Sequence, residues 1–189
     1  MAGNTANPRI WEGADFWVAP VGTTLPAYDA DLTSASGWEA VGLLSQDGSS
    51  ESRADDTADH YAWGGILVRT TKSRHKRQVV VTALEDNLTV FGLVNPGSTA
   101  ATSAGVNSRA YKVPRSDPRS FILELRDGNI RKRRHFPRGE VESVGEIALS
   151  DSALTSYALT ITIYPDATGT LYSDYDNDPQ AAVVEAPEG

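Results

Sequence analysis

Hydrophobic and polar residues alternate along much of the chain, which is the pattern of strands that bury one face. In residues 156–164 the apolar Tyr157, Leu159, Ile161 and Ile163 alternate with Ser, Ala and Thr residues, and this predicts a half-buried strand. The spacers between such segments are rich in turn-forming Gly, Pro, Asp, Asn and Ser residues. The same alternation predicts further strands at residues 15–20, 38–44, 66–72, 77–83, 109–113, 120–126, 130–136 and 140–149.

Residues 84–94 have a different spacing, in which apolar side chains recur every three or four positions. This spacing predicts a helix with one apolar face, with Glu85 and Asp86 in its first turn, where the helix dipole favours acidic groups. The sequence Asn95-Pro96-Gly97 would end the helix. Many short strands and one helix together predict a mainly β fold, an antiparallel β-sandwich or barrel with one packed α-helix.

Three segments do not fit a compact sandwich. Residues 45–60 contain no large aliphatic side chain, and residues 165–189 carry acids but no base. We therefore expect one domain at residues 15–164, an N-terminal arm at 1–14, a long inter-strand loop at 45–60 and an acidic C-terminal arm at 165–189. Loops of this length are usually functional or disordered, and in an assembly these segments are candidates to order against a neighbour.

Charge is divided unevenly along the chain. Residues 1–60 have ten acids and two bases (−8), residues 61–140 have six acids and fifteen bases (+9), and residues 141–189 have nine acids and no base (−9). A basic middle between acidic ends suggests that the ends meet the middle, within one molecule or on a neighbour. The alternative, charges simply mixed on one folded surface, stays open.

Composition excludes several classes of protein. A chain of 189 residues with 40% hydrophobic side chains and no cysteine can bury a core without disulfides, and cannot hold a cysteine zinc site or a thiol nucleophile. No apolar stretch is long enough for a membrane-spanning helix, and the first residues lack the basic and apolar regions of a signal peptide. We expect no membrane insertion.

Candidate catalytic residues are sparse. His60, His75 and His135 lie far apart, and the chain has no H-E-x-x-H pattern, G-x-S-x-G elbow, Walker loop or G-x-G-x-x-G loop. We therefore expect no enzymatic activity and no cofactor.

One acidic pattern resembles a calcium loop. Asp174, Asp176 and Asp178 occupy its positions one, three and five, and Glu185 falls at position twelve. Position six is Pro179, however, where the turn of such a loop requires glycine. We interpret the spacing as a coincidence within an acidic segment and these acids as weak metal candidates.

The basic run at residues 131–134 resembles a phosphate-binding patch. In a strand, however, Lys132 and Arg134 lie on one face and Arg131 and Arg133 on the other, so no single face carries the whole charge. Nucleic-acid capture is therefore the weaker reading. A strand whose bases are solvated or paired at an interface between subunits is the stronger one.

The four tryptophans give an alternative function. Aromatic faces suit the apolar surfaces of sugars, so exposed Trp and Tyr side chains could form a carbohydrate-binding module on a β-sandwich. Trp17 and Trp38 lie in predicted strands and are expected in the core. Trp63, which is followed by two glycines, is the ambiguous one.

Several segments, in their order and spacing, resemble the major tail proteins, or tail tube proteins, of long-tailed, siphovirus-type phages of actinobacteria. The resemblance covers most of the chain but finds no fixed pattern in residues 165–189. The matching segments are residues 5–20 (Thr-Ala-Asn-Pro-Arg-Ile-Trp-Glu-Gly-Ala-Asp-Phe-Trp-Val-Ala-Pro), 61–65 (Tyr-Ala-Trp-Gly-Gly), 82–87, 90–98, 137–141 and 160–166.

The resemblance implies a β-sandwich with one helix whose copies form hexameric rings that stack into a hollow tube. It implies self-association, contacts with the tape-measure, tail-terminator and baseplate or tail-tip proteins, and a place in the virion tail after synthesis in the host bacterial cytoplasm. The family's long loop typically reaches the adjacent ring, and residues 45–60 match it by position and composition. Its charged residues, the ring-stacking candidates, are Asp47, Glu51, Arg53, Asp55, Asp56 and Asp59.

A tube that conducts DNA during ejection must not bind it. Contacts to phosphates supply essentially all non-specific affinity for DNA, so the resemblance implies a hydrophilic, non-basic lumen through which DNA passes without specific binding. The bases at 131–134 would then point outward or pair with the acidic arms of neighbours. The lumen candidates are Glu51, Glu140, Glu142 and Glu146.

Overall fold

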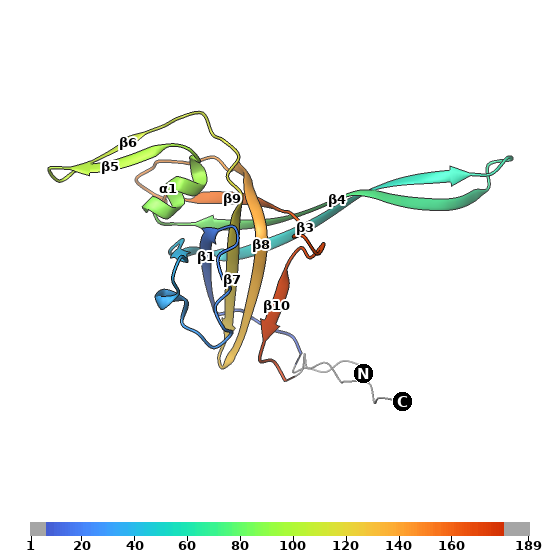
Figure 1. The fold of residues 1–189 in the computed structure, drawn as a ribbon, viewed down its shortest axis with the longest axis horizontal. Helices are drawn as coiled ribbons and strands as arrows, with labels where there is room; N and C mark the ends of the chain where they lie inside the picture. The colour runs from blue at the N-terminus through green and yellow to red at the C-terminus, as the bar shows by residue number, and fades with distance from the viewer. Residues whose placement is uncertain (1–6, 180–189) are drawn as a thin grey trace.

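The computed structural model describes residues 7–179, and most of its regular structure is antiparallel β-sheet (Figure 1). The strands are β1 (Gly13–Pro20), β2 (Glu39–Ala40), β3 (Leu44–Tyr61), β4 (Leu67–Ala83), β5 (Thr99–Ser103), β6 (Val106–Ala110), β7 (Arg119–Asp127), β8 (Ile130–Val144), β9 (Tyr157–Ile163) and β10 (Ser173–Asp176). The helices are α1 (Leu88–Val94) and a 3₁₀ turn, η1 (Leu32–Ser34). The predicted fold class, mainly β with one packed α-helix, is confirmed.

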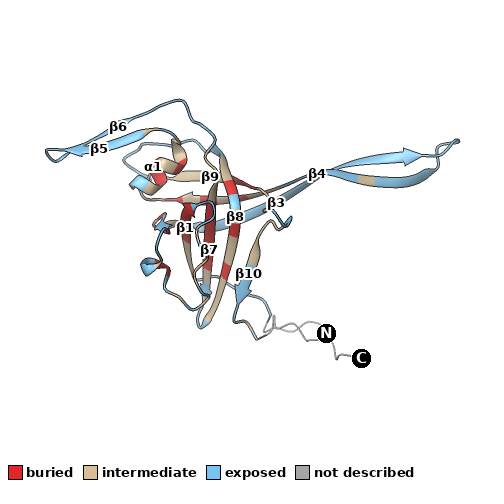
Figure 2. Ribbon diagram, in the orientation of Figure 1, coloured by how far each residue is buried: buried red, intermediate tan, exposed pale blue. Residues whose placement is uncertain are grey.

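Eight strands form one curled sheet in the order β2-β1-β7-β8-β9-β4-β3, with β10 beside β8, while β5 and β6 form a separate hairpin. Buried residues concentrate on β1, β7, β8, β9 and α1 (Figure 2). The inward faces of the sheet meet in one core, which α1 closes with Val90 and Leu93. The alternation predicted this correctly: Leu159, Ile161 and Ile163 are all buried in that core.

A second, smaller core lies on the opposite face of β1 and β7. There Ile122, which interrupts the alternation of residues 120–126, packs with Trp17, Trp38 and Leu32. The segment that connects β1 to β2 covers this face, so β7 is buried on both sides. The expectation that Trp17 and Trp38 belong to the core is confirmed by exposures of 8% and 6%.

The helix is shorter than the predicted 84–94 because Asn87 caps it. The Asn87 side chain accepts a hydrogen bond from the Val90 N–H (2.8 Å), so α1 begins at Leu88. Asparagine is among the best N-cap residues because its oxygen satisfies a free amide of the first turn. Glu85 therefore lies outside the helix, where its carboxylate accepts the Leu43 N–H (2.7 Å).

Removal of this cap tests the local account. Asn87→Ala loses the bond to Val90 and a second bond from the Asn87 amide to the Val41 carbonyl (2.9 Å). We expect the free energy of unfolding, measured by urea denaturation, to fall by about 1–2 kcal/mol. The control Asn107→Ala, on the exposed strand β6, should change it by less than about 0.5 kcal/mol. Equal losses would contradict the capping role.

The prediction of a loop at residues 45–60 is wrong. These residues form most of β3, which pairs along its length with β4. The ladder holds without apolar residues because cross-strand polar pairs, such as Asp59 with Thr70 (2.7 Å), accompany the backbone bonds. Beyond the pair Ala54–Lys76 the two strands leave the body as a long ribbon (Figure 1). We call residues 54–76 the hairpin arm.

Predicted strands 130–136 and 140–149 merge into β8, even though Pro137 lies inside it. The pairs Phe121–Phe136 and Arg119–Gly139 flank a register shift at this point, and beyond it β8 pairs with β9. A proline is tolerated there because its missing N–H falls at the irregularity rather than in the ladder. Other boundaries also differ: 66–72 and 77–83 fuse into β4, 38–44 shrinks to β2, and 109–113 begins earlier, as β6.

Both predicted terminal arms contribute strands. The strand β1 begins at Gly13, inside the predicted arm 1–14, and β10 lies inside the predicted arm 165–189. Residues 1–6 and 180–189, including the apolar run 181–184 and Glu185, lie outside the described residues.

Candidate assembly surfaces and lumen face

The acidic strand β10 lies along the basic part of β8. Asp174 pairs in register with Arg134, and its carboxylate accepts bonds from Arg134 Nε (2.6 Å) and Lys132 Nζ (3.0 Å). Burial by itself would raise the pKa of Asp174, but these cationic donors hold the pKa below its ordinary value. Both strands of this pairing, β8 and β10, belong to the same chain.

The segment whose spacing resembles a calcium loop therefore has a different structure. Asp174 and Asp176 belong to a strand rather than to a loop. The Asp174 oxygens bind two cationic side chains, and Asp178 pairs with Arg9 (2.7 Å). Among residues 7–179 no group of three or more His, Asp or Glu side chains could hold a metal ion.

The other face of β8 holds a buried arginine. Arg133 is 1% exposed and donates to Glu124 Oε2 (2.8 and 3.0 Å) and to the carbonyls of Ala27 (2.7 Å) and Ala30 (2.8 Å). Its neighbour on this face, Arg131, lies over the Tyr28 ring, 4.6 Å from the centroid. The alternation along the strand therefore predicted correctly that Arg131 and Arg133 lie on the opposite face of β8 from Lys132 and Arg134. Every base of the run 131–134 has partners within the chain, and its pairing with neighbouring subunits stays a prediction.

His135 shares this face and gives a pH-dependent term in stability. Its ring lies edge-on to Trp38 (6.1 Å), with Nε2 3.1 Å from Ser120 Oγ. Burial lowers its pKa from the ordinary 6.5, so the unfolded chain binds the proton first as pH falls. We expect the free energy of unfolding to drop between about pH 7.5 and 5.5, and His135→Gln to flatten that slope. A His135→Gln variant that kept the full slope would contradict the role of burial.

Glu51 joins the acidic beginning of the chain to the basic middle. It accepts from Arg77 (2.6 Å) and from the Tyr172 hydroxyl (3.1 Å), and it also pairs with Arg134. Arg77 and Arg134 both lie over the Tyr172 ring, 5.3 and 4.5 Å from its centroid. The question left open by the charge pattern is thereby answered for these groups: acidic ends meet the basic middle within one molecule.

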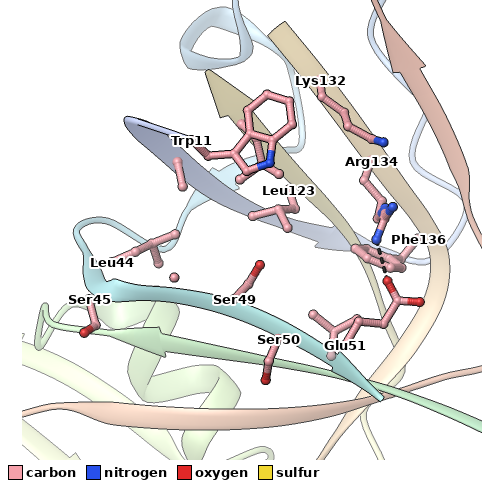
Figure 3. Close-up of a pocket in the computed structure, with 14 residues that line it drawn as sticks. Trp11, Leu44, Ser45, Ser49, Ser50, Glu51, Leu123, Lys132, Arg134 and Phe136 are labelled. Atoms are coloured by element: carbon pink, nitrogen blue, oxygen red, sulfur yellow. Dashed lines mark hydrogen bonds and ion pairs between the residues drawn. The ribbon is translucent and has the colours of Figure 1, made fainter. Parts of the chain in front are cut away.

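A cavity of about 430 Å³ opens beside this cluster, between β3 and the inner faces of β1, β7 and β8. In Figure 3 the Trp11 ring lies at one side of it, while Arg134 is joined to Glu51 on the side nearest Phe136. We call it the barrel pocket. Its lining mixes serine and charged side chains with apolar ones, and the apolar ones are Trp11, Ala14, Leu44, Val79, Leu123, Leu125 and Phe136.

The outer face of β3, β4, β8 and β9 is polar and nearly free of bases. Pairing and alternation place it opposite the buried Val79, Val81, Leu159 and Ile161. The hydroxyl, amide and small side chains on it are Ser50, Ser52, Gln78, Val80, Thr82, Ala158, Thr160 and Thr162.

One carboxylate organises this outer face. Glu142 accepts from Lys76 Nζ (2.7 Å), Gln78 Nε2 (2.7 Å) and the Thr162 hydroxyl. The bond from Lys76, followed by that from Thr162, lowers the pKa of Glu142 below its ordinary value. Lys76, the base on this face that lies next to Glu142, is thus paired with an acid of the same chain.

The predicted lumen acids do not share one surface. Glu142 lies on the outer face, Glu51 on the inner one with Arg77, and Glu146 is exposed in the segment after β8. Glu140 accepts the Asp117 N–H (2.9 Å). Sequence reasoning looked for acids and missed Gln78, Thr160 and Thr162, although the polar positions of the alternating strands already carried that signal.

The ring-stacking candidates divide between the arm and its base. Asp55, Asp56 and Asp59 lie in the hairpin arm, whereas Asp47, Glu51 and Arg53 lie at its base, in the part of β3 that precedes it. Hydrogen bonds from Arg53 and then from His75 lower the pKa of Asp55 to about 2.

The end of the arm is apolar and exposed. Trp63 stands at the turn with an exposed fraction of 103%, the value of a side chain free of neighbours. The exposed apolar residues around it, which we call the tip cluster with Trp63 included, are Tyr61, Trp63, Ile66, Leu67 and Val68. Sequence analysis singled out Trp63 but assigned Ile66, Leu67 and Val68 to an ordinary strand and gave Tyr61 no strand.

Comparison with known proteins identifies the family of the chain. A family model described as phage tail tube protein matches residues 1–186. No curated protein sequence matches the chain. Within the part of the chain that the structure describes, no helix is long and apolar enough to cross a membrane.

The matching family is a structural one rather than an enzyme family, and it does not favour the carbohydrate-binding alternative. The matched residues include the strands β2 and β3 at the two ends of the sheet, the hairpin arm and the polar outer face. The chain therefore belongs to the phage tail tube protein family, whose place is the tail of the virion.

Proposed function

We propose that this chain is the repeating subunit of a phage tail tube in which hexameric rings stack and DNA passes through the bore. The observation that carries the proposal is the polar outer face of β3, β4, β8 and β9. An extended sheet surface rich in hydroxyl and amide groups, on which Lys76 is paired to Glu142 and Val80 and Ala158 are the apolar side chains, offers a DNA backbone few cationic contacts.

The lumen lining we propose is this outer face. Non-specific DNA affinity comes from bases that neutralise phosphates, so a lining of Gln78, Thr82 and Thr160 would let the duplex slide. Glu142, one of the four acids predicted for the lumen, would contribute negative charge there. Glu140 and Glu146 stay proposals for the same lining, while Glu51 faces the barrel pocket and would line it instead.

The ends of the sheet support ring formation. The strands β2 and β3 lie at opposite ends of the strand order, so a subunit presents two different edges. A ring closes when one kind of edge meets the other on the next copy, and closure removes exposed edges that otherwise favour aggregation.

The hairpin arm supports stacking. Residues 52–61 extend over about 30 Å at roughly 3.3 Å per residue, far enough to reach an adjacent ring. Asp55, Asp56 and Asp59 would then lie at the contact. The tape-measure, terminator and tail-tip proteins would meet the same surfaces at the two ends of the tube, and the subunits would be made in the host cytoplasm before assembly.

Microscopy of the purified protein tests the proposal. We expect concentrated protein to form rings or tubes in negative stain, and sedimentation to show a species that grows with concentration. A chain that stays monomeric at every concentration would contradict the proposal. Quenching of tryptophan fluorescence by sugars in that monomer would favour the carbohydrate-binding alternative.

A further inference from the structure

We propose that the tip cluster of one subunit inserts Trp63 into the barrel pocket of a second copy of the chain. This inference rests on the proposed function, because it names the contact by which the hairpin arm joins two subunits. It assigns a knob and a socket to two surfaces that are far apart on one molecule.

The knob, which is the tip cluster, is more apolar than expected for a turn that stays in contact with solvent in the assembly. Trp63 is 103% exposed, and Ile66 and Val68 beside it are 68% and 67% exposed. Contiguous exposed apolar groups mark interaction sites, and tryptophan is enriched among the residues that dominate binding energy. A two-stranded ribbon is also marginally stable by itself, so burial of its tip would stabilise the arm.

The socket is large enough to admit an indole together with neighbouring side chains of the tip, and it offers both apolar and cationic surface. The barrel pocket, at about 430 Å³, falls in the range of small-ligand sites, and Leu123 and Phe136 contribute apolar surface to it. Lys132 and Arg134 line it as well, and cations next to an indole face are favourable. Both are held by Asp174, so an entering side chain leaves no charge without a partner.

A larger concavity, about 950 Å³, lies where the arm meets the body, but it fits the knob less well. It has about twice the volume of the barrel pocket, and its lining combines the apolar Ile163, Pro165 and Leu171 with the charged Asp56, Arg74, Lys76 and Glu142. An apolar tip placed there would desolvate several charged groups without replacing their bonds to water, which is costly.

The occupant must come from another copy. The tip lies about 30 Å along the ribbon from the base of the arm, while Ser49, Ser50 and Glu51 of that base line the pocket. The ribbon extends away from the body (Figure 1), so its tip lies far from its own pocket. An apolar knob that fits a pocket elsewhere on the same molecule produces a heterologous contact, which repeats from copy to copy and builds rings or filaments.

Disulfide trapping tests the contact directly, because the chain has no native cysteine. Ala62→Cys keeps Trp63 and places a thiol beside it, and Ser49→Cys places one in the pocket lining. We expect oxidised tubes of the double variant to give a ladder of covalent oligomers under denaturing conditions, and either single variant to give none. The matched control pairs Ala62→Cys with Ala54→Cys in the larger concavity, and should give no ladder.

A substitution of the knob provides a second readout. We expect Trp63→Ala to raise the concentration needed for tube formation at least about tenfold, Trp63→Phe to recover part of the loss, and both to melt at the wild-type temperature as monomers. Val113→Ala, 85% exposed away from the arm, is the control and should assemble normally.

The outcomes separate this inference from the proposed function. Tubes that form without a ladder from Ser49→Cys, a ladder only from Ala54→Cys, or normal assembly of Trp63→Ala would each overturn the knob-and-socket contact and leave the tube subunit standing. Wild-type protein that never assembles would overturn the proposed function, and this contact with it.

Discussion

Replacing Glu124 with alanine is expected to lower the free energy of unfolding by about 3–5 kcal/mol. The reason is the position of Arg133, whose side chain is 1% exposed and makes two of its bonds to Glu124 Oε2. Without the carboxylate the guanidinium keeps its carbonyl partners Ala27 and Ala30 but loses its counter-charge at a position where it is almost fully buried. An unpaired buried charge costs far more than an exposed one.

Urea denaturation at neutral pH measures this effect, and a neighbouring ion pair is the control. Arg126 pairs with Asp15 (2.6 Å), and both side chains are more than 40% exposed. Asp15→Ala should therefore cost no more than about 1 kcal/mol. If the two variants lost equal stability, the buried pair would have no special role. A Glu124→Leu, Arg133→Met double variant should recover much of the loss, because it removes both charges together.

Replacing the hairpin arm with a two-residue turn is expected to give a folded subunit that forms no tubes. Ala54 and Lys76 are paired in the antiparallel ladder, so Asn-Gly in place of residues 55–75 can connect them by a tight turn. The core loses nothing, because the arm lies outside both buried clusters. The arm's reach and its tip cluster are lost, and stacking depends on both in our proposal.

Both strands of the arm are removed together because they pair with each other. Deleting one strand alone, such as residues 48–58, would leave β4 without its partner and expose its edge. Circular dichroism and thermal melting should report a native fold for the shortened chain, and negative-stain microscopy should show monomers or isolated rings. Tubes of normal length would show that the arm is not the stacking element.

The sequence predicted the fold class well because burial and alternation coincide in β7, β9 and the inner half of β4. Each of these strands has apolar residues at every second position, and the structure buries Leu159, Ile161, Val79 and Val81 as expected. The helix was found but placed too early, since its apolar spacing continues through Leu84 whereas capping by Asn87 decides where it starts.

The arm could not be recognised from hydrophobic pattern, because neither of its faces is buried. Its strands are held by backbone pairing and by contacts such as Asp59 with Thr70, and these depend on which residues face each other across the ribbon. The candidate site was affected in the same way. Sequence analysis identified the charged groups of residues 45–60 and 131–134, but their partners are distant in the chain.

The sequence by itself determined the mainly β class, the separation of the bases of β8 onto two faces, and the family to which the chain belongs. These follow from local order along the chain, namely alternation and motif spacing. Only the tertiary structure decided that Glu51 and Asp174 pair with Arg134, that Arg133 is buried on Glu124, and that Trp63 is exposed at the end of a ribbon. Each of these depends on contacts between residues far apart in sequence, which periodicity cannot encode.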